Sequence, residues 1–309
     1  MKKSITLLSV FVLLLFAISC KKESSGSGSD NTSTEVAFQS DDQARVSNES
    51  DDAGNDAETA LELSPTLTGK MASAQSIICD ASVSIDSISN PRTITITYNG
   101  TNCFGNRTRT GVVKISMAQG IRWKDAGASI SVTFQNLKIT RLRDNKSITL
   151  NGTETHTNVT GGLLFELASL GTVTHTVTSD DMSITFDDNT QRTWHIAKQR
   201  VFSYNNGVVI TSTGTHTEGS ETGIAEWGTN RVGHSFSAST LAPIVVRQDC
   251  NFRIVSGEVK HVTPNITAIT TFGLDASGNP TGCPGTGNYY LKTVWTGPAG
   301  NTHTVILPY

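Results

Sequence analysis

The residues best suited to chemistry are the histidines, of which the chain has seven. His156, His175 and His216 each stand between two threonines, so neighbouring strands could bring them together as a metal or proton site. Strand alternation argues against such a cluster, because His175 shares a face with valines whereas His156 shares one with Glu154 and Asn158. Isolated histidines within a sheet are therefore the favoured interpretation.

Two pairs of adjacent aspartates form the other chemically suggestive pattern. Asp180-Asp181 and Asp187-Asp188 could serve calcium binding or glycoside hydrolysis, both of which use carboxylates. Adjacent residues on a strand point to opposite faces, however, and both pairs fall where turns are expected. The sequence also contains no nucleophile elbow, zinc-protease, phosphate-loop or dinucleotide motif. We therefore expect no catalytic residues, no bound metal and no cofactor.

Four tryptophans are the best candidates for a binding surface. Rings of this size could stack against glycans on an exposed face, whereas packing in the core is the alternative. These candidate binding residues are Trp123, Trp194, Trp227 and Trp295.

The N-terminus predicts how the chain is exported. Residues 1–19 resemble a lipoprotein signal peptide, in which Lys2 and Lys3 precede an apolar run shorter than the about 20 residues of a membrane span. Ala17-Ile18-Ser19-Cys20 resembles the lipobox of bacterial lipoproteins, with Ala17 where Leu is commonest. We expect cleavage before Cys20 and lipid attachment to that cysteine, which would hold the protein on a membrane. An ordinary secretory signal with an incidental Cys20 is the alternative.

Residues 20–35 predict a flexible tether. Lys21–Asp30 is rich in glycine and serine and has no apolar residue to bury. Charges directly after Cys20 resemble the surface-export signal of lipoproteins from Bacteroidota, although Glu23 alone is acidic in the first few positions. These features predict an outer-membrane lipid anchor in the cell envelope, on the periplasmic face or at the cell surface. The net charge of −3 argues against a nucleic-acid partner.

The cysteine count fits this compartment, since four cysteines remain once Cys20 is assigned to lipid. Cys79 with Cys103 and Cys250 with Cys283 each flank strand-like runs, so we expect these two local disulfides among the three possible pairings. In the chain-entropy model each would contribute about 3.5 kcal/mol. A four-cysteine zinc site is the alternative, but no Cys-x-x-Cys spacing supports it.

Residues 36–66 predict one short helix. Ser40 to Gln43 reads as a capping box, Val46, Ala53, Ala57, Ala60 and Leu61 follow at helical spacing, and Pro65 marks the end. Between residues 41 and 62 stand eight acidic residues and one basic residue, which indicates a mostly solvated helix. A half-ordered acidic stalk and a docked helix both remain open.

Residues 67–309 predict β-structure alone. Short alternating runs rich in Thr, Val, Ile and Ser follow one another between turns, of which residues 205–207 give the strongest hairpin signal. A change of phase after Phe134 predicts a bulge near Gln135 or Asn136. The expected fold class is all-β, a large antiparallel meander forming a twisted sheet, a sandwich or a partly closed barrel. Faint repeats allow two related halves dividing near 180–195.

The order of these elements resembles a group of uncharacterised β-rich lipoproteins from Bacteroidota. The resemblance covers most of residues 36–309 and is carried by 107–115, 130–139 and 148–153, with Cys250, 253–257 and Cys283 in the second half. It implies the fold and the envelope location, and no assigned activity comes with it.

We therefore expect a non-enzymatic envelope lipoprotein with a binding or structural role. Its partners would be the membrane through the anchor and a glycan, lipid or envelope protein through a broad β surface. The alternative is a metal-dependent or glycoside hydrolase of the envelope, which would require ionisable side chains to converge in one pocket.

Overall fold

The computed structural model describes residues 30–64, 78–283, 287–297 and 300–309. One long helix precedes a β-sheet that takes up most of the remaining chain, so the expected all-β class is confirmed. The signal peptide, Cys20 and most of the tether lie outside the described residues. Among the described helices, none combines the length and the apolar character needed to cross a membrane.

Fifteen strands form one antiparallel sheet in which sequence neighbours pair almost throughout. The strands are β1 (Ala81–Asp86), β2 (Arg92–Thr101), β3 (Arg107–Met117), β4 (Ala128–Arg141), β5 (Ser147–Asn158), β6 (Thr172–Phe186), β7 (Gln191–Tyr204), β8 (Val208–Gly214), β9 (His216–Glu218), β10 (Glu221–Thr229), β11 (Ser235–Arg247), β12 (Arg253–Thr263), β13 (Ile266–Leu274), β14 (Tyr290–Thr296) and β15 (Thr302–Pro308). Short helical segments are η1 (Leu164–Glu166), α3 (Leu167–Leu170) and η2 (Gln248–Cys250). The meander expected from the turn chemistry is therefore present.

The pairing departs from simple order at one place, where β7, β8, β11 and β10 form a small closed ring. β8 pairs with the second half of β7 and β10 pairs with its first half. The same two strands also pair with successive parts of β11. β8 and β10 therefore lie one after the other between β7 and β11. The segment that connects them contains β9, which pairs only with β10.

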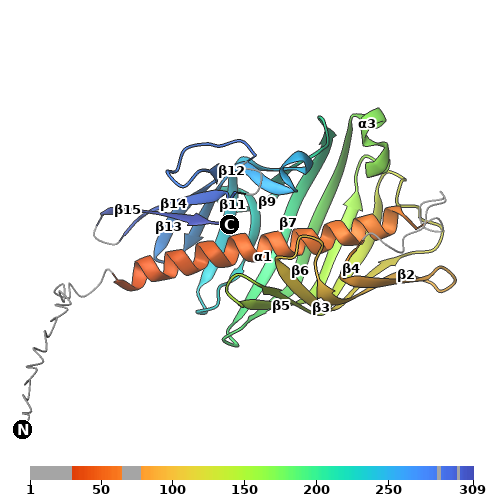
Figure 1. Ribbon diagram of the computed structural model, residues 1–309, viewed down its shortest axis with the longest axis horizontal. Coiled ribbons are helices and arrows are strands. Elements are labelled where there is room, and N and C mark those ends of the chain that lie inside the picture. Colours follow the sequence, from red (N-terminus) through yellow and green to blue (C-terminus); the bar gives the residue numbers. More distant parts are fainter. Residues whose placement is uncertain (1–29, 65–77, 284–286, 298–299) are drawn as a thin grey trace, which may run out of the picture.

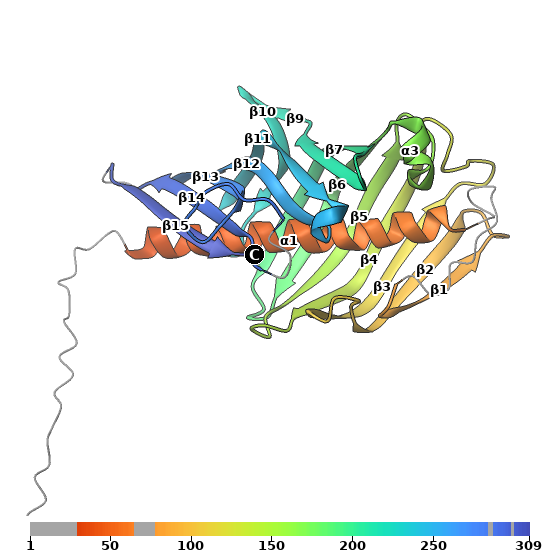
Figure 2. The same cartoon turned by 45° about the horizontal axis from the view of Figure 1, so that its top comes forward.

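The helix α1 (Asp30–Glu62) lies across the strands on one face of the sheet (Figure 1; Figure 2). Strands that are distant in the sheet reach the same part of this helix. Asp41 pairs with Arg141 at the end of β4, while Asp42 pairs with Arg231, which follows β10. The sheet is therefore rolled partly around α1.

The helix differs from its sequence prediction in length and in burial. It spans 33 residues and begins ten residues before Ser40, so the capping box expected there is wrong. The five apolar positions from Val46 to Leu61 are buried against the sheet, as their spacing predicted. The expectation of a mostly solvated helix is also wrong, because many of its acidic side chains form ion pairs with arginines of the sheet and its loops.

Local details of the strands follow the sequence closely. The register shifts between Phe134 and Leu137, and Asn136 adopts a φ of 51°, so the bulge is confirmed. Residues 205–207 connect β7 to β8 as the predicted hairpin turn. Residues 180–195 span the end of β6, the turn that follows it and the start of β7, and these two strands pair in the middle of the continuous sheet.

Two disulfides link loops at the two ends of the chain. Cys79 bonds to Cys103 and Cys250 bonds to Cys283, with Cα atoms 5.3 and 5.1 Å apart. The local pairing is therefore the one present.

Candidate functional site

Strand β7 supplies much of the polar surface that faces α1. Its alternate residues are buried on one face, where Arg192, Lys198 and Arg200 stand among Trp194, Ile196 and Phe202. Cationic side chains are costly to bury without partners. The acidic residues of α1 and the carboxylate of Glu226 meet this requirement.

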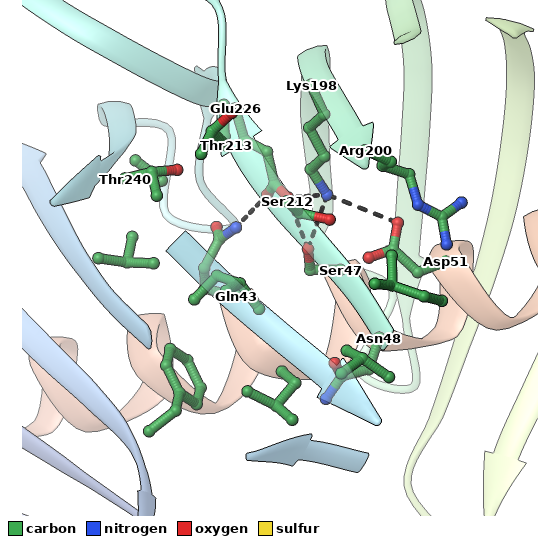
Figure 3. Close-up of a pocket in the computed structure, with 18 of the residues that line it drawn as sticks. Gln43, Ser47, Asn48, Asp51, Lys198, Arg200, Ser212, Thr213, Glu226 and Thr240 are labelled. Atoms are coloured by element: carbon green, nitrogen blue, oxygen red, sulfur yellow. Dashed lines mark hydrogen bonds and ion pairs between the residues drawn. The ribbon is translucent and has the colours of Figure 1, made fainter. Parts of the chain in front are cut away.

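Glu226 on β10 is the centre of the first buried network (Figure 3). Its carboxylate lies 2.6 Å from the Lys198 ammonium and accepts hydrogen bonds from Ser47, Gln43 and the Trp194 indole. Burial alone would raise the pKa of Glu226, but the charges of Lys198 and Arg192 lower it to about 2. Glu226 is thus a fixed anion that ties α1 to β7 and β10.

A second network joins the C-terminal part of α1 to β5 and β6. Glu58 Oε1 lies 3.2 Å from His156 Nδ1 and 3.3 Å from His175 Nδ1, and His156 Nε2 lies 2.9 Å from Glu154. Burial would lower the pKa of His156, but its hydrogen bonds to Glu154 and Glu58 raise it to about 9. Burial would raise the pKa of Glu58, but His175, His156 and Arg200 together hold the pKa of that carboxyl well below its usual range.

Arg109 on β3 connects α1 to the part of the rolled sheet that contains β2 and β3. It makes a bidentate pair with Asp80 at 2.7 Å for each bond and a third bond of 2.7 Å to Asp56 on α1. Its guanidinium also lies 4.4 Å from the centre of the Tyr98 ring, whose hydroxyl donates to Asp56. These contacts hold the C-terminal half of α1 from the side opposite β7.

An open cleft of 460 Å³ lies beside this part of α1. Three exposed phenylalanines surround it, Phe104, Phe165 and Phe252, with 65%, 54% and 42% of their surface exposed. Its apolar wall includes Ile210 on β8, and polar residues of α1 line its floor. We call this site the aromatic cleft. Large apolar side chains gathered at one opening mark a binding site more often than a plain surface.

A smaller cavity of 90 Å³ continues the aromatic cleft along α1 (Figure 3). The two spaces share four lining residues, Asp52, Asn55, Ile210 and Phe252. Beyond them the cavity has an apolar wall contributed by β11, β12 and β13, which includes Val246, Ile254, Val259 and Phe272. An apolar surface therefore runs from the three phenylalanines toward the buried Lys198.

Local constraints hold each rim phenylalanine in place. Phe104 follows directly after Cys103, and Phe252 stands two residues after Cys250, so each disulfide fixes a loop that carries one ring. Phe252 has a φ of 53°, a left-handed conformation that is rare for a bulky residue and is concentrated at functional sites. The backbone N–H of Phe165 donates to Glu62 at the end of α1.

The sequence-predicted histidines separate into two groups. His156 and His175 converge beneath α1, so the expectation that they are isolated is wrong, and neither lines the aromatic cleft. His216 on β9 is apart from them and stacks on Trp227 of β10, with ring centres 4.1 Å apart. His195 on β7 also stacks on this tryptophan.

The other candidate residues do not gather at this site. Asp181 accepts a backbone hydrogen bond from β5, and Asp188 accepts one from the turn that follows it. The four candidate tryptophans also stand apart from the aromatic cleft, and three of them are buried in the core: Trp123, Trp194 and Trp295. Only Trp227 of the four keeps a partly exposed ring for stacking.

Within the described residues, one group of three metal-ligating side chains lies within 4.8 Å, and it consists of Asp249, Cys250 and Cys283. Its two sulfur atoms are bonded to each other, so they offer no thiolate to a metal ion.

The sequence analysis missed the charged residues of β7 and the three rim phenylalanines. Alternation over residues 191–204 places Arg192, Lys198 and Arg200 on the face of Trp194. This signal could have identified the charged face of β7 that contacts α1. No comparable signal existed for Phe104, Phe165 and Phe252, because they come from separate loops that only the fold brings together.

Comparison with known proteins adds no relative, since no protein-family model, no curated protein and no solved structure matches the chain.

Proposed function

We propose that the chain is a lipid-anchored protein of the cell envelope that binds an amphiphilic ligand in the aromatic cleft without transforming it. The observation that carries this proposal is the meeting of Phe104, Phe165 and Phe252 around one 460 Å³ opening. Exposing three such rings to water is unfavourable, and covering them with an apolar group removes that cost.

The lining of the site supports a ligand with one apolar part and one polar end. Its lining combines aliphatic and aromatic side chains with Asn55, Thr59 and three carboxylates of α1. Two of these carboxylates, Asp52 and Asp56, already pair with Arg107 and Arg109. The third, Glu58, lies next to the rings of His156 and His175. An uncharged hydrogen-bonding end, such as a glycerol or sugar hydroxyl group, suits this floor better than a free charge.

Binding without catalysis is favoured by the position of the ionisable groups. The two histidines that converge, His156 and His175, are buried beneath α1, and each ring lies within hydrogen-bonding distance of Glu58. A general base must reach the reacting group, and neither histidine lines the cleft. Glu58 does line it, but one oxygen of this carboxylate lies next to both histidine rings.

The proposed ligand class is tested by photolabelling the full anchored chain in isolated envelopes with a photoactivatable alkyne monoacylglycerol. We expect labelled peptides to contain Phe104, Phe165 or Phe252. Replacing Phe252 with Asp should lower labelling roughly tenfold, since losing the ring contact costs about 1–2 kcal/mol. The matched control is Ile88→Asp, which changes a side chain that is 87% exposed in the β1–β2 turn.

Equal loss of labelling in the two variants, or labels spread over the whole surface, would contradict the proposal. Recovery of the probe as free fatty acid in the presence of the protein would instead support the hydrolase alternative. The anchor is tested separately, by metabolic labelling with an alkyne palmitate, which Cys20→Ala should abolish.

A further inference from the structure

A third space in the molecule, of 540 Å³, lies on another flank of α1. It forms where the rolled sheet brings its two ends toward each other. Arg107 and Arg141 come from β3 and β4, whereas Arg253, Leu291 and Leu307 come from β12, β14 and β15. This space shares Asn48 of α1 with the cavity of Figure 3 but none of the three rim phenylalanines.

Positive charge dominates the lining of this space. Five guanidinium groups face two carboxylates, Asp41 and Glu49. We call it the arginine pocket, after its five members Arg45, Arg107, Arg141, Arg143 and Arg253. They come from α1, two strands, a turn and a strand of the other half, so the fold rather than a local run of sequence assembles them.

The two carboxylates are already engaged by two of the arginines. Glu49 pairs with Arg107, and Asp41 pairs with Arg141. Arg253 donates to the backbone oxygens of Gly287 and Tyr309. Arg107 and Arg141 each pair with a second carboxylate as well, Asp52 and Asp144. Within the described residues, none of these four carboxylates forms an ion pair with the other three arginines.

Arg45 is the residue of this pocket whose surroundings most favour an anion. Only 6% of its surface is exposed, its Nη2 donates to the Lys146 carbonyl at 2.6 Å, and its Nε is buried without a partner. It forms no ion pair within the part of the chain that the structure describes. A buried guanidinium group that makes no ion pair with the described residues is unfavourable, so this pocket favours a negatively charged ligand.

Arg143, at the mouth of the pocket, also makes no ion pair within the described residues. It is exposed, and Asp144 stands beside it in the sequence. Burial and then the nearby charge of Arg141 lower the pKa values of both Arg143 and Arg45, which is the effect expected of crowded cations.

We propose that the arginine pocket binds a phosphate-type oxyanion, either free in solution or as part of a lipid headgroup. Arginine forks bind phosphate and carboxylate oxygens through paired hydrogen bonds. A planar carboxylate presents two oxygens, whereas a tetrahedral phosphate group presents three or four in different directions. Guanidinium groups supplied by both halves of the sheet can donate to such a group from more than one side.

The test is calorimetric titration of the full chain, in a neutral detergent at low salt, with inorganic pyrophosphate as the probe. We expect saturable binding at one site per chain. Arg143→Glu should weaken this binding at least tenfold, because it reverses a charge at the mouth without removing any ion pair of the fold. The control is Arg122→Glu, which makes the same charge change on an exposed residue near the opposite end of β4 and breaks only an exposed ion pair with Asp125.

Equal weakening by the two variants would overturn the proposal, since it would show attraction to net charge alone. Absence of saturable binding up to about ten millimolar pyrophosphate would also overturn it. Where binding is found, competition by vesicles containing phosphatidylglycerol, but not by phosphatidylcholine vesicles, assigns the site to a lipid headgroup. Binding that neither vesicle displaces assigns it to soluble phosphate compounds. The rim variant Phe252→Asp should leave pyrophosphate binding unchanged, so this result is independent of the aromatic cleft.

Discussion

His156 predicts a specific dependence of stability on pH. Each ring nitrogen lies near a different carboxylate, Glu58 and Glu154, and the side chain is 1% exposed. Both nitrogens must carry a proton to donate to both acceptors, so the folded state stabilises the imidazolium form. The folded pKa is about 9, compared with 6.5 for an unperturbed histidine.

The sign of the effect follows from these two pKa values. Below pH 6.5 both the folded and the unfolded states bind the proton, and the full stabilisation is present. As pH rises from 6.5 to 9, the unfolded state loses its proton first, so the free energy of unfolding decreases. At about 1.4 kcal/mol per pH unit, the total decrease is about 3 kcal/mol.

The assay is urea unfolding at a series of pH values between 6 and 9.5, followed by tryptophan fluorescence. His156→Gln should remove the decrease in this range and lower the free energy of unfolding at pH 6 by about 3 kcal/mol. His303→Gln is the control, because this ring stacks on Trp295 in the outer hairpin. A wild-type free energy that stays constant from pH 6.5 to 9, or a glutamine variant that keeps the full slope, would refute the reasoning.

Three further changes test other parts of the structure. Arg109→Met should lower the free energy of unfolding by about 3–5 kcal/mol in urea, because it leaves the fully buried carboxylate of Asp80 unpaired. Replacing Cys79 and Cys103 together with serine should cost about 3 kcal/mol in the same assay, and no loss would show that the link is dispensable. Gly214→Ala should lower the yield of folded chain, measured by circular dichroism, since its β-carbon would lie 2.1 Å from a carbonyl oxygen of β10. A normal yield would show that β8 and β10 do not approach each other this closely.

Much of the sheet could be predicted from the sequence because its signals are local. The phase change after Phe134 reports the bulge, and the turn at 205–207 reports the hairpin, since each depends on neighbouring residues alone. The position of α1 could not be predicted in the same way. Its acidic residues indicate a solvated helix until the partners are known, and Asp42 finds its partner 189 positions later, at Arg231.

The candidate site shows the same limit. His156 and His175 could be placed on strands, but their convergence depends on Glu58 reaching them from a helix 98 and 117 positions away. The alternation pattern compares each histidine only with its neighbours along the same strand. It contains no information about a helix that packs on both strands. The three rim phenylalanines have no shared pattern at all, because their meeting point is created by the roll of the sheet.

The place of α1 at the beginning of the chain has a consequence for how the protein folds. Gln43 of α1 donates a hydrogen bond to Glu226 of β10, and the two residues are separated by 183 positions. Closing a segment of this length is slow compared with forming the hairpins of the meander. We therefore expect the sheet to assemble first and α1, although it precedes the sheet in the chain, to dock last. Until α1 docks, its acidic side chains and the basic side chains of β7 are all hydrated.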